Sequence, residues 1–240
     1  MGTLIVGCFH IGNPSEMSVE MQDAIDNADM LLIENNVDHR FGYKSMMDDN
    51  LNIFFNDNTN KDRVIIAYKE QMLDRMPEAR LFLDYLRNQK KVVILSDEGS
   101  PLINDSGTLA IKMALNDGHK IKFLSGPSTP MLTYSNAFNF INMFPSLVDG
   151  FCFLAARSDD PRSIDRVNAV LNAGVGVVLN FTGTWSTTKF DELFGNRKVI
   201  LCLDMILETE NVWLSELKDV DIYTSNGGLL SMFILPDFSK

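Results

Sequence analysis

Apolar segments of strand length recur along this chain and alternate with helical patterns. In the first half they cover Leu4–Phe9, Met30–Ile33, Arg63–Ala67, Val92–Ser96 and Lys120–Leu124. In the second half they cover Phe151–Leu154, Gly176–Phe181, Val199–Leu203 and Leu229–Leu235. Most are apolar throughout, which is typical of strands covered on both faces. Strands of this kind, separated by helices, predict an α/β protein with largely parallel sheets and right-handed crossovers.

Several helix boundaries between these segments can be predicted from the sequence. A helix is expected from about Ser18, and a helical pattern covers Tyr68–Asn88. Pro77 interrupts that pattern, so a second helix is expected to start there. Asp160 and Pro161 have the chemistry of an N-cap and a first helical residue, and this helix is expected to end near Gly174.

A turn-forming hexamer, Ser125-Gly-Pro-Ser-Thr-Pro130, separates the two groups of strands. We therefore expect two αβα lobes, residues 1–124 and 125–240, with a cleft between them that holds a small molecule. A chain of 240 residues is long enough for two such domains.

Composition narrows the partners and the compartment. The formal net charge is 21 − 32 = −11, which disfavours a nucleic-acid partner because phosphate backbones repel such a surface. No stretch approaches the ~20 apolar residues that span a bilayer, and no basic residue precedes the N-terminal apolar run as in a secretory signal. The three cysteines stand singly within apolar segments. These features favour a cytoplasmic protein with reduced thiols, without a membrane partner.

Three loops are candidates for a binding site. The strand Val92–Ser96 runs directly into Asp97, Glu98 and Gly99, and the first strand runs into the loop 9–16. In open α/β sheets, ligands bind outside the carboxyl ends of strands. The third candidate is Ser125–Ser128, where helix N-terminal amides could receive a carboxylate. Each loop taken alone is equally explained as turn and cap chemistry.

The order and spacing of these loops resemble one family. Gly2-Thr-Leu, then Ile11-Gly-Asn, then Ser96-Asp-Glu-Gly-Ser-Pro-Leu-Ile-Asn-Asp-Ser-Gly107, then Gly126-Pro-Ser follow one another. The ribosomal RNA small-subunit cytidine 2′-O-methyltransferase branch of the tetrapyrrole methylases typically reads S-D-A-G-T-P-x-I-S-D-P-G at the third of these. The resemblance is clear over residues 2–34 and 92–129.

The resemblance implies a two-lobed fold that binds S-adenosylmethionine in its cleft, commonly as a homodimer and without a metal. Carried over residue by residue, it assigns the cofactor to Ile11, Gly12, Asn13, Asp97, Glu98, Gly99, Ser100, Pro101, Gly126, Pro127, Ser128 and Thr129. A sulfonium methyl donor needs carbonyls and carboxylates nearby, and backbone donors for its own carboxylate. Because methyl transfer depends on alignment of donor and acceptor, a shaped cleft supplies much of the catalysis.

The departures from the family concern basic and catalytic positions. Glu34-Asn-Asn-Val replaces E-D-T-R, Asn180-Phe-Thr-Gly-Thr-Trp-Ser186 stands where E-S-x-H-R is usual, and Asp204-Met-Ile-Leu207 replaces E-L-T-K. His10 replaces a family proline and is the one histidine expected near the cleft, so it is the candidate catalytic residue, with a role in the turn or in packing as the alternative. No cysteine or carboxylate stands at ligand spacing from the three histidines, so no metal site is expected.

Two hypotheses follow from these residues. The first is an S-adenosylmethionine-dependent methyltransferase whose acceptor is not ribosomal RNA, since the residues expected to hold RNA are lost. The second is a catalytically silent relative that serves as a binding or structural protein in a larger assembly.

Overall fold

The computed structural model divides the chain by contacts into two compact units, Met1–Pro127 and Ser128–Lys240. It describes residues 1–8, 17–34, 63–68, 70–96, 107–154, 160–180, 190–203, 205, 210–220 and 230–237. The division falls within residues 124–128, which form neither helix nor strand and which include the turn expected from the sequence.

The first unit contains a parallel sheet with the strand order β3-β2-β4-β1-β5. Its strands are β1 (Thr3–Cys8), β2 (Met30–Glu34), β3 (Val64–Tyr68), β4 (Val92–Ser96) and β5 (Lys120–Phe123). This confirms the parallel arrangement expected for the first lobe. Its helical segments are α1 (Val19–Asp26), the 3₁₀ segment η3 (Glu70–Arg75), α3 (Pro77–Arg87) and α4 (Thr108–Asn116).

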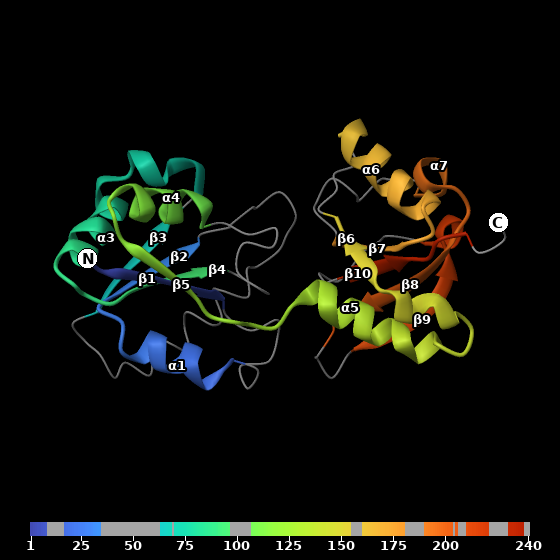
Figure 1. Ribbon diagram of the computed structural model, residues 1–240, viewed down its shortest axis with the longest axis horizontal. Coiled ribbons are helices and arrows are strands. Elements are labelled where there is room, and N and C mark those ends of the chain that lie inside the picture. The colour runs from blue at the N-terminus through green and yellow to red at the C-terminus, as the bar shows by residue number, and fades with distance from the viewer. Residues whose placement is uncertain are drawn as a thin grey trace. The chain divides into compact units, whose positions relative to one another are not determined.

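Both faces of this sheet are covered, which explains the continuously apolar strands. Leu4, Val92 and Ile94 face a core built with η3, α3 and α4. The alternate residues Val93 and Leu95 face a second core built with α1. Figure 1 shows α1 on one side of the sheet and α3 and α4 on the other. Side chains of a strand alternate between faces, so a strand buried on both sides has no polar position.

The expected helix boundaries are confirmed, with one correction. Ser18 caps α1 by accepting a hydrogen bond from the amide of Met21, and Asp160 caps a helix that starts at Pro161. Pro77 starts α3, as expected. The expectation of a helix from Tyr68 is wrong, because Tyr68 is the last residue of β3 and pairs with Glu34 of β2.

The second unit contains a mixed sheet with the order β6-β7-β10-β8-β9. Its strands are β6 (Phe151–Phe153), β7 (Gly176–Asn180), β8 (Lys198–Leu203), β9 (Asn211–Glu216) and β10 (Leu230–Ile234). Its helical segments are α5 (Thr129–Ala137), α6 (Pro161–Asn172), α7 (Phe190–Phe194) and the 3₁₀ segments η4 (Phe138–Phe140), η5 (Pro145–Asp149) and η7 (Leu217–Asp219). Figure 1 shows α5 on one face of the sheet and α6 and α7 on the other.

The largely parallel sheet expected for the second lobe is wrong. Only β6 and β7 run parallel among its described pairs, whereas β10 is antiparallel to both β7 and β8, and β8 is antiparallel to β9. The physical reason lies in the connections. Leu203 and Asn211 are too close in sequence for a parallel crossover, which needs a dozen residues or more, so β8 and β9 form an antiparallel pair.

Candidate functional site

The sheet of the first unit brings the ends of three strands together. β1 lies between β4 and β5, with Cys8 opposite Ser96 and Val6 opposite Phe123. The amide of Leu124 extends the second pairing by donating to the carbonyl of Val6 at 2.9 Å. All three strands are parallel, so their carboxyl ends meet at one edge of the sheet.

Each candidate loop continues from one of these three ends. Residues 9–16 follow Cys8, residues 97–106 follow Ser96, and the turn at 125–128 follows Leu124. Since Cys8 and Ser96 are direct partners in the sheet, the first two loops start side by side. This edge is the candidate site.

Nine of the expected site residues lie outside the described residues. They are His10, Ile11, Gly12, Asn13, Asp97, Glu98, Gly99, Ser100 and Pro101. The strand ends that carry them are buried and built from small side chains. Ser96 is 3% exposed, Cys8 is 2% exposed, and the hydroxyl of Ser96 donates to the carbonyl of Gly7 at 3.4 Å.

The other four expected site residues, Gly126, Pro127, Ser128 and Thr129, are half-buried. Ser128 is the N-cap of α5 and has extended backbone angles, but its side chain makes no capping hydrogen bond. Thr129 is the first residue of the helix, and Pro130 follows it. The first-turn amides are therefore not closed off by a side chain of their own helix, as they are at Ser18 in α1.

The second unit has a comparable edge where β7 and β8 end. Ser231, near the start of β10, pairs with Asn180 of β7 and with Cys202 of β8. The sequence departs from the family in the segments that follow these strands, which begin with Phe181 and Asp204. A buried pair of hydroxyl groups, from Thr133 of α5 and Ser231, lies at this edge with the two oxygens 2.8 Å apart. Sequence analysis missed this pair, because an isolated Thr and an isolated Ser in apolar segments give no sign that they meet.

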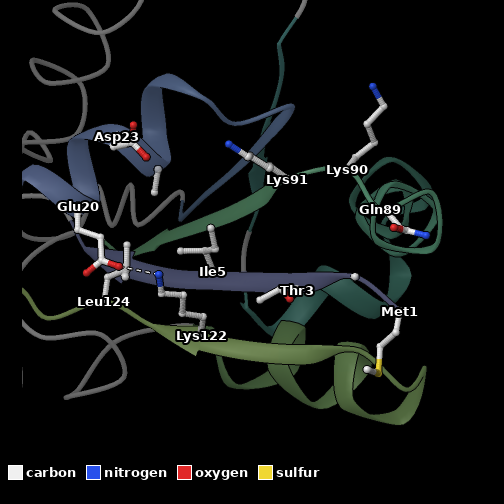
Figure 2. Close-up of a pocket in the computed structure, with 12 residues that line it drawn as sticks. Met1, Thr3, Ile5, Glu20, Asp23, Gln89, Lys90, Lys91, Lys122 and Leu124 are labelled. Atoms are coloured by element: carbon white, nitrogen blue, oxygen red, sulfur yellow. Dashed lines mark hydrogen bonds and ion pairs between the residues drawn. The ribbon is translucent and has the colours of Figure 1, made fainter.

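The first unit also contains a pocket of about 420 Å³, lined by residues of α1, β1 and β5 and by the residues before β4. Figure 2 shows it between α1 and the starts of β1 and β4, with Lys122 reaching Glu20 across it. The ammonium of Lys122 lies 2.6 Å from the carboxylate of Glu20. Half of its twelve lining residues precede or begin their strands, including Met1, Gly2 and Thr3 before and in β1 and Lys90 and Lys91 before β4. Of the candidate edge, the pocket includes Leu124, the residue that follows β5.

His119 has a structural environment. Its Nδ1 accepts a hydrogen bond from the amide of Gly2 at 3.1 Å, and its Nε2 lies 2.9 Å from a carboxylate oxygen of Asp117. Arg87 holds the same carboxylate with two hydrogen bonds, and these lower the pKa of Asp117 and raise that of Arg87. Both ring nitrogens of His119 are thus engaged. Across the described part of the chain, no three His, Cys, Asp or Glu side chains are grouped to hold a metal ion.

The three cysteines are free thiols. Burial raises the pKa of Cys202 to about 12, so its thiol is not a nucleophile at neutral pH. Among the described residues, no helix has the length and apolar character needed to cross a membrane.

Comparison with known proteins gives both a sequence match and a fold match. No protein-family model matches the chain. Over 129 residues it is 26% identical to ribosomal RNA small subunit methyltransferase I of Mycobacterium tuberculosis. This match covers 53% of the chain but only 40% of that relative, so the chain aligns with less than half of the relative's length.

Two solved structures match nearly the whole chain. The methyltransferase CobJ has a TM-score of 0.69 at 14% identity and covers 98% of this chain and 95% of its own. The uroporphyrin III C-methyl transferase of Thermus thermophilus has a TM-score of 0.64 at 16% identity and covers 97% of both chains. The fold likeness and the sequence match agree with the motif order at the candidate edge. The chain therefore has the fold of the tetrapyrrole methylase superfamily, and over about half its length its sequence is similar to a ribosomal RNA methyltransferase.

Proposed function

We propose that the protein transfers a methyl group from S-adenosylmethionine, which binds at the edge formed by the carboxyl ends of β4, β1 and β5. The observation that carries this proposal is the strand order. Two of the family's motif segments follow Cys8 and Ser96, which are direct partners in the sheet. The third follows β5, the strand on the other side of β1. A sequence similarity alone would not require three separated segments to start at one edge.

The described parts of the edge fit such a cofactor. Cys8 and Ser96, at the strand ends, have small side chains that are buried. The segment after Leu124 leads into α5 of the second unit, whose first turn has no side-chain cap, so the amides of Thr129 and Met131 are suited to receiving a carboxylate. When bound, the cofactor supplies an electrophilic methyl group on a sulfonium centre.

We assign its binding to the residues carried over from the family. Asp97 and Glu98 would supply carboxylate oxygens, and Gly99 would allow close approach of the backbone. The full set is Ile11, Gly12, Asn13, Asp97, Glu98, Gly99, Ser100, Pro101, Gly126, Pro127, Ser128 and Thr129.

His10 is the proposed general base. It follows the end of β1 by two residues, whereas His119 is engaged through both ring nitrogens with Gly2 and Asp117, at the opposite end of β1. An acceptor hydroxyl would lose its proton to His10 as the oxygen–methyl bond forms and the sulfonium–methyl bond breaks. Alignment within the site would supply most of the remaining rate enhancement.

The acceptor is proposed to be something other than ribosomal RNA, although the M. tuberculosis relative is named for that substrate. The net charge of −11 opposes a polyanionic acceptor and favours approach of the cationic donor. The basic residues that the branch places after its second and seventh strands are absent from this sequence. A homodimer, which the resemblance implies, and a cytoplasmic location, which the isolated cysteines favour, are part of the same proposal.

Isothermal titration with S-adenosylmethionine and S-adenosylhomocysteine tests the cofactor site. We expect micromolar binding that Asp97→Ala and Gly99→Val both weaken by at least about tenfold, since one lost charge-assisted hydrogen bond corresponds to that factor. Asp74→Ala, an exposed carboxylate on η3, is the matched control and should bind as the wild type does. A folded protein that binds neither ligand would overturn the proposal and favour a silent binding or structural role.

Transfer of a tritiated methyl group separates the acceptor classes. Small-subunit ribosomal RNA, the intact small ribosomal subunit and a protein-free extract of small molecules would each be offered as acceptor. We expect label in the small-molecule fraction, lost in His10→Ala. Label in the ribosomal RNA at comparable rate would show that the acceptor assignment is wrong while leaving the cofactor site intact.

A further inference from the structure

The hydroxyl pair Thr133 and Ser231 lies within an otherwise apolar core between α5 and the second sheet. Thr133 is 0% exposed and Ser231 is 2% exposed. Around them pack apolar side chains such as Ala137, Val178 and Phe233. A buried hydroxyl is costly unless it is hydrogen-bonded, and two apolar residues would fill the same space without that requirement. The pair therefore contributes something that packing alone does not.

What it contributes is a fixed connection between four chain segments. The hydroxyl of Thr133 reaches the carbonyl of Thr129 at 2.8 Å, and that of Ser231 lies 3.4 Å from the carbonyl of Leu179 in β7. The sulfur of Met205, two residues beyond the end of β8, lies 3.6 Å from the Thr133 oxygen.

Each hydroxyl has one proton, so the pair cannot make all of these hydrogen bonds at once. In one arrangement that joins the two hydroxyls, Ser231 donates to Thr133 and Thr133 donates to Thr129, and in another Thr133 donates to Ser231 and Ser231 donates to Leu179. Both hydroxyls donate in either arrangement. The first arrangement joins the first turn of α5 to the central strand β10, and the second joins α5 to β10 and β7.

The position of these contacts is informative. Thr129 opens α5 directly after the turn Gly126–Ser128, and Ser128 accepts the first backbone hydrogen bond of the helix from Leu132 at 2.9 Å. Ser231 pairs with Asn180 and Cys202, close to where β7 and β8 end. The hydroxyl pair thus sets the start of α5 against the two strand ends from which the divergent second-unit segments continue.

We infer that Thr133, acting through Ser231, is a positioning residue for Thr129 at the start of α5 and for the segment Gly126–Ser128 before it. We infer also that Thr133 sets the affinity for the cofactor without touching it. This inference rests on the proposed function, because that turn is part of the proposed cofactor site. The hydroxyl group at position 133 is what the function requires. Serine at this position should therefore keep the function, and valine, which has the shape of threonine but no hydroxyl, should lose it.

The test compares Thr133→Val and Thr133→Ser with Ser163→Ala. Ser163 is also a buried hydroxyl of the second unit, bonded to Asp160 at 3.0 Å, but it belongs to α6 on the other face of the sheet. Titration with S-adenosylhomocysteine should show a Kd raised about tenfold in Thr133→Val, the factor that corresponds to one buried hydrogen bond. Thr133→Ser and Ser163→Ala should keep the wild-type Kd. An unchanged Kd in Thr133→Val would overturn the inference and leave the proposed function standing.

Amide hydrogen exchange provides a readout that does not need the cofactor. The amides of Thr129, Met131 and Leu132 should exchange faster in Thr133→Val than in the wild type, and Ser163→Ala should leave them unchanged. If neither the wild type nor any variant bound S-adenosylhomocysteine, the proposed function would fail. Equal exchange rates at these amides in Thr133→Val and the wild type would separately refute the positioning role of Thr133. Should Thr133→Val not fold, Ser231→Ala breaks the same connection from β10 and is judged by the same two measurements.

Discussion

His119 and Gly2, 117 residues apart in the sequence, are joined by a hydrogen bond of 3.1 Å in which the Gly2 amide donates to the imidazole Nδ1. Because Nδ1 accepts, the ring proton is on Nε2 and points to Asp117. The carbonyl of Gly2 accepts from the amide of Lys120, so His119 and Lys120 together hold the start of β1 against β5. The candidate site begins at the other end of the same strand.

We predict that His119→Ala lowers the free energy of unfolding by about 2 kcal/mol, because it leaves the buried Gly2 amide without an acceptor. Urea titration measures the change. Lys120→Ala, at the exposed neighbouring position, is the control and should change the free energy by less than about 0.5 kcal/mol. Equal effects of the two substitutions would show that the histidine does not anchor β1.

A second prediction concerns Gln89, which has φ of 57° and follows the C-cap of α3. Its amide bonds to the carbonyl of Leu86 and the next amide bonds to that of Tyr85, which is the left-handed helix ending that favours glycine. We expect Gln89→Gly to raise the free energy of unfolding by about 0.5 to 1 kcal/mol, since relief of the left-handed strain exceeds the added entropy of the unfolded chain.

The reverse substitution is available at Gly174, which has φ of 83° and open space around its missing Cβ. Gly174→Ala should lower the free energy of unfolding by about 1 kcal/mol, because its cost is conformational and not steric. Both variants would be measured by urea unfolding under the same conditions. A loss of stability in Gln89→Gly would mean that the glutamine side chain contributes more than its backbone strain costs.

The first unit was predictable from sequence because its strands are buried on both faces. Val92–Leu95 is apolar throughout, and a strand of that kind belongs in a parallel sheet with helices on each side. The second unit shows why the same reasoning fails there. Val199–Leu203 is as apolar as Val92–Ser96, but the direction of its neighbours depends on connection length and on the insertion of β10 between β7 and β8.

The sequence predicts which three loops form the candidate site, but it does not predict the strand order that brings the ends of β4, β1 and β5 side by side. The motifs predict Asp97–Pro101 and Gly126–Thr129 as site residues, whereas the edge from which their segments continue follows from the strand order that places β1 between β4 and β5. The Thr133 and Ser231 pair and the His119 anchor were both missed for one reason. Each joins residues 98 or more positions apart, and no local pattern distinguishes a bonded buried hydroxyl or imidazole from an exposed one.

A third prediction concerns pH and Glu216 in β9. Hydrogen bonds and ion pairs with Lys218 at 2.7 Å and Lys198 at 3.1 Å lower its pKa from 4.5 to about 2. A carboxyl group whose pKa is lower in the folded state contributes stability above pH 4.5, and this contribution is lost as the pH falls through 2. Wild type should therefore be more stable than Glu216→Gln near neutral pH, with the difference disappearing at the acid end.

Urea midpoints of both proteins between pH 2 and pH 7 would measure this difference. Asp74→Asn is the control, since Asp74 takes part in none of the ion pairs among the described residues. The difference at neutral pH should also shrink in concentrated salt, because the pair is partly exposed. A difference between wild type and Glu216→Gln that stays constant with pH would show that the ion pairs do not stabilise the folded chain.

A fourth prediction orders the reactivity of the three thiols. Cys202 is 0% exposed and has a pKa raised to about 12, so at pH 8 only about one thiol in ten thousand is ionised. Cys8 is 2% exposed, whereas Cys152 is half-buried. A thiol-reactive pyridyl disulfide should therefore modify one cysteine of the native protein quickly, and mass spectrometry should place the adduct on Cys152. Cys152→Ser should abolish this fast phase, and denaturant should restore reaction at the two buried thiols. Fast modification of Cys8 in the native protein would instead mean that the end of β1 opens to solvent. The description of Cys8 as a buried strand end of the candidate site would then be wrong.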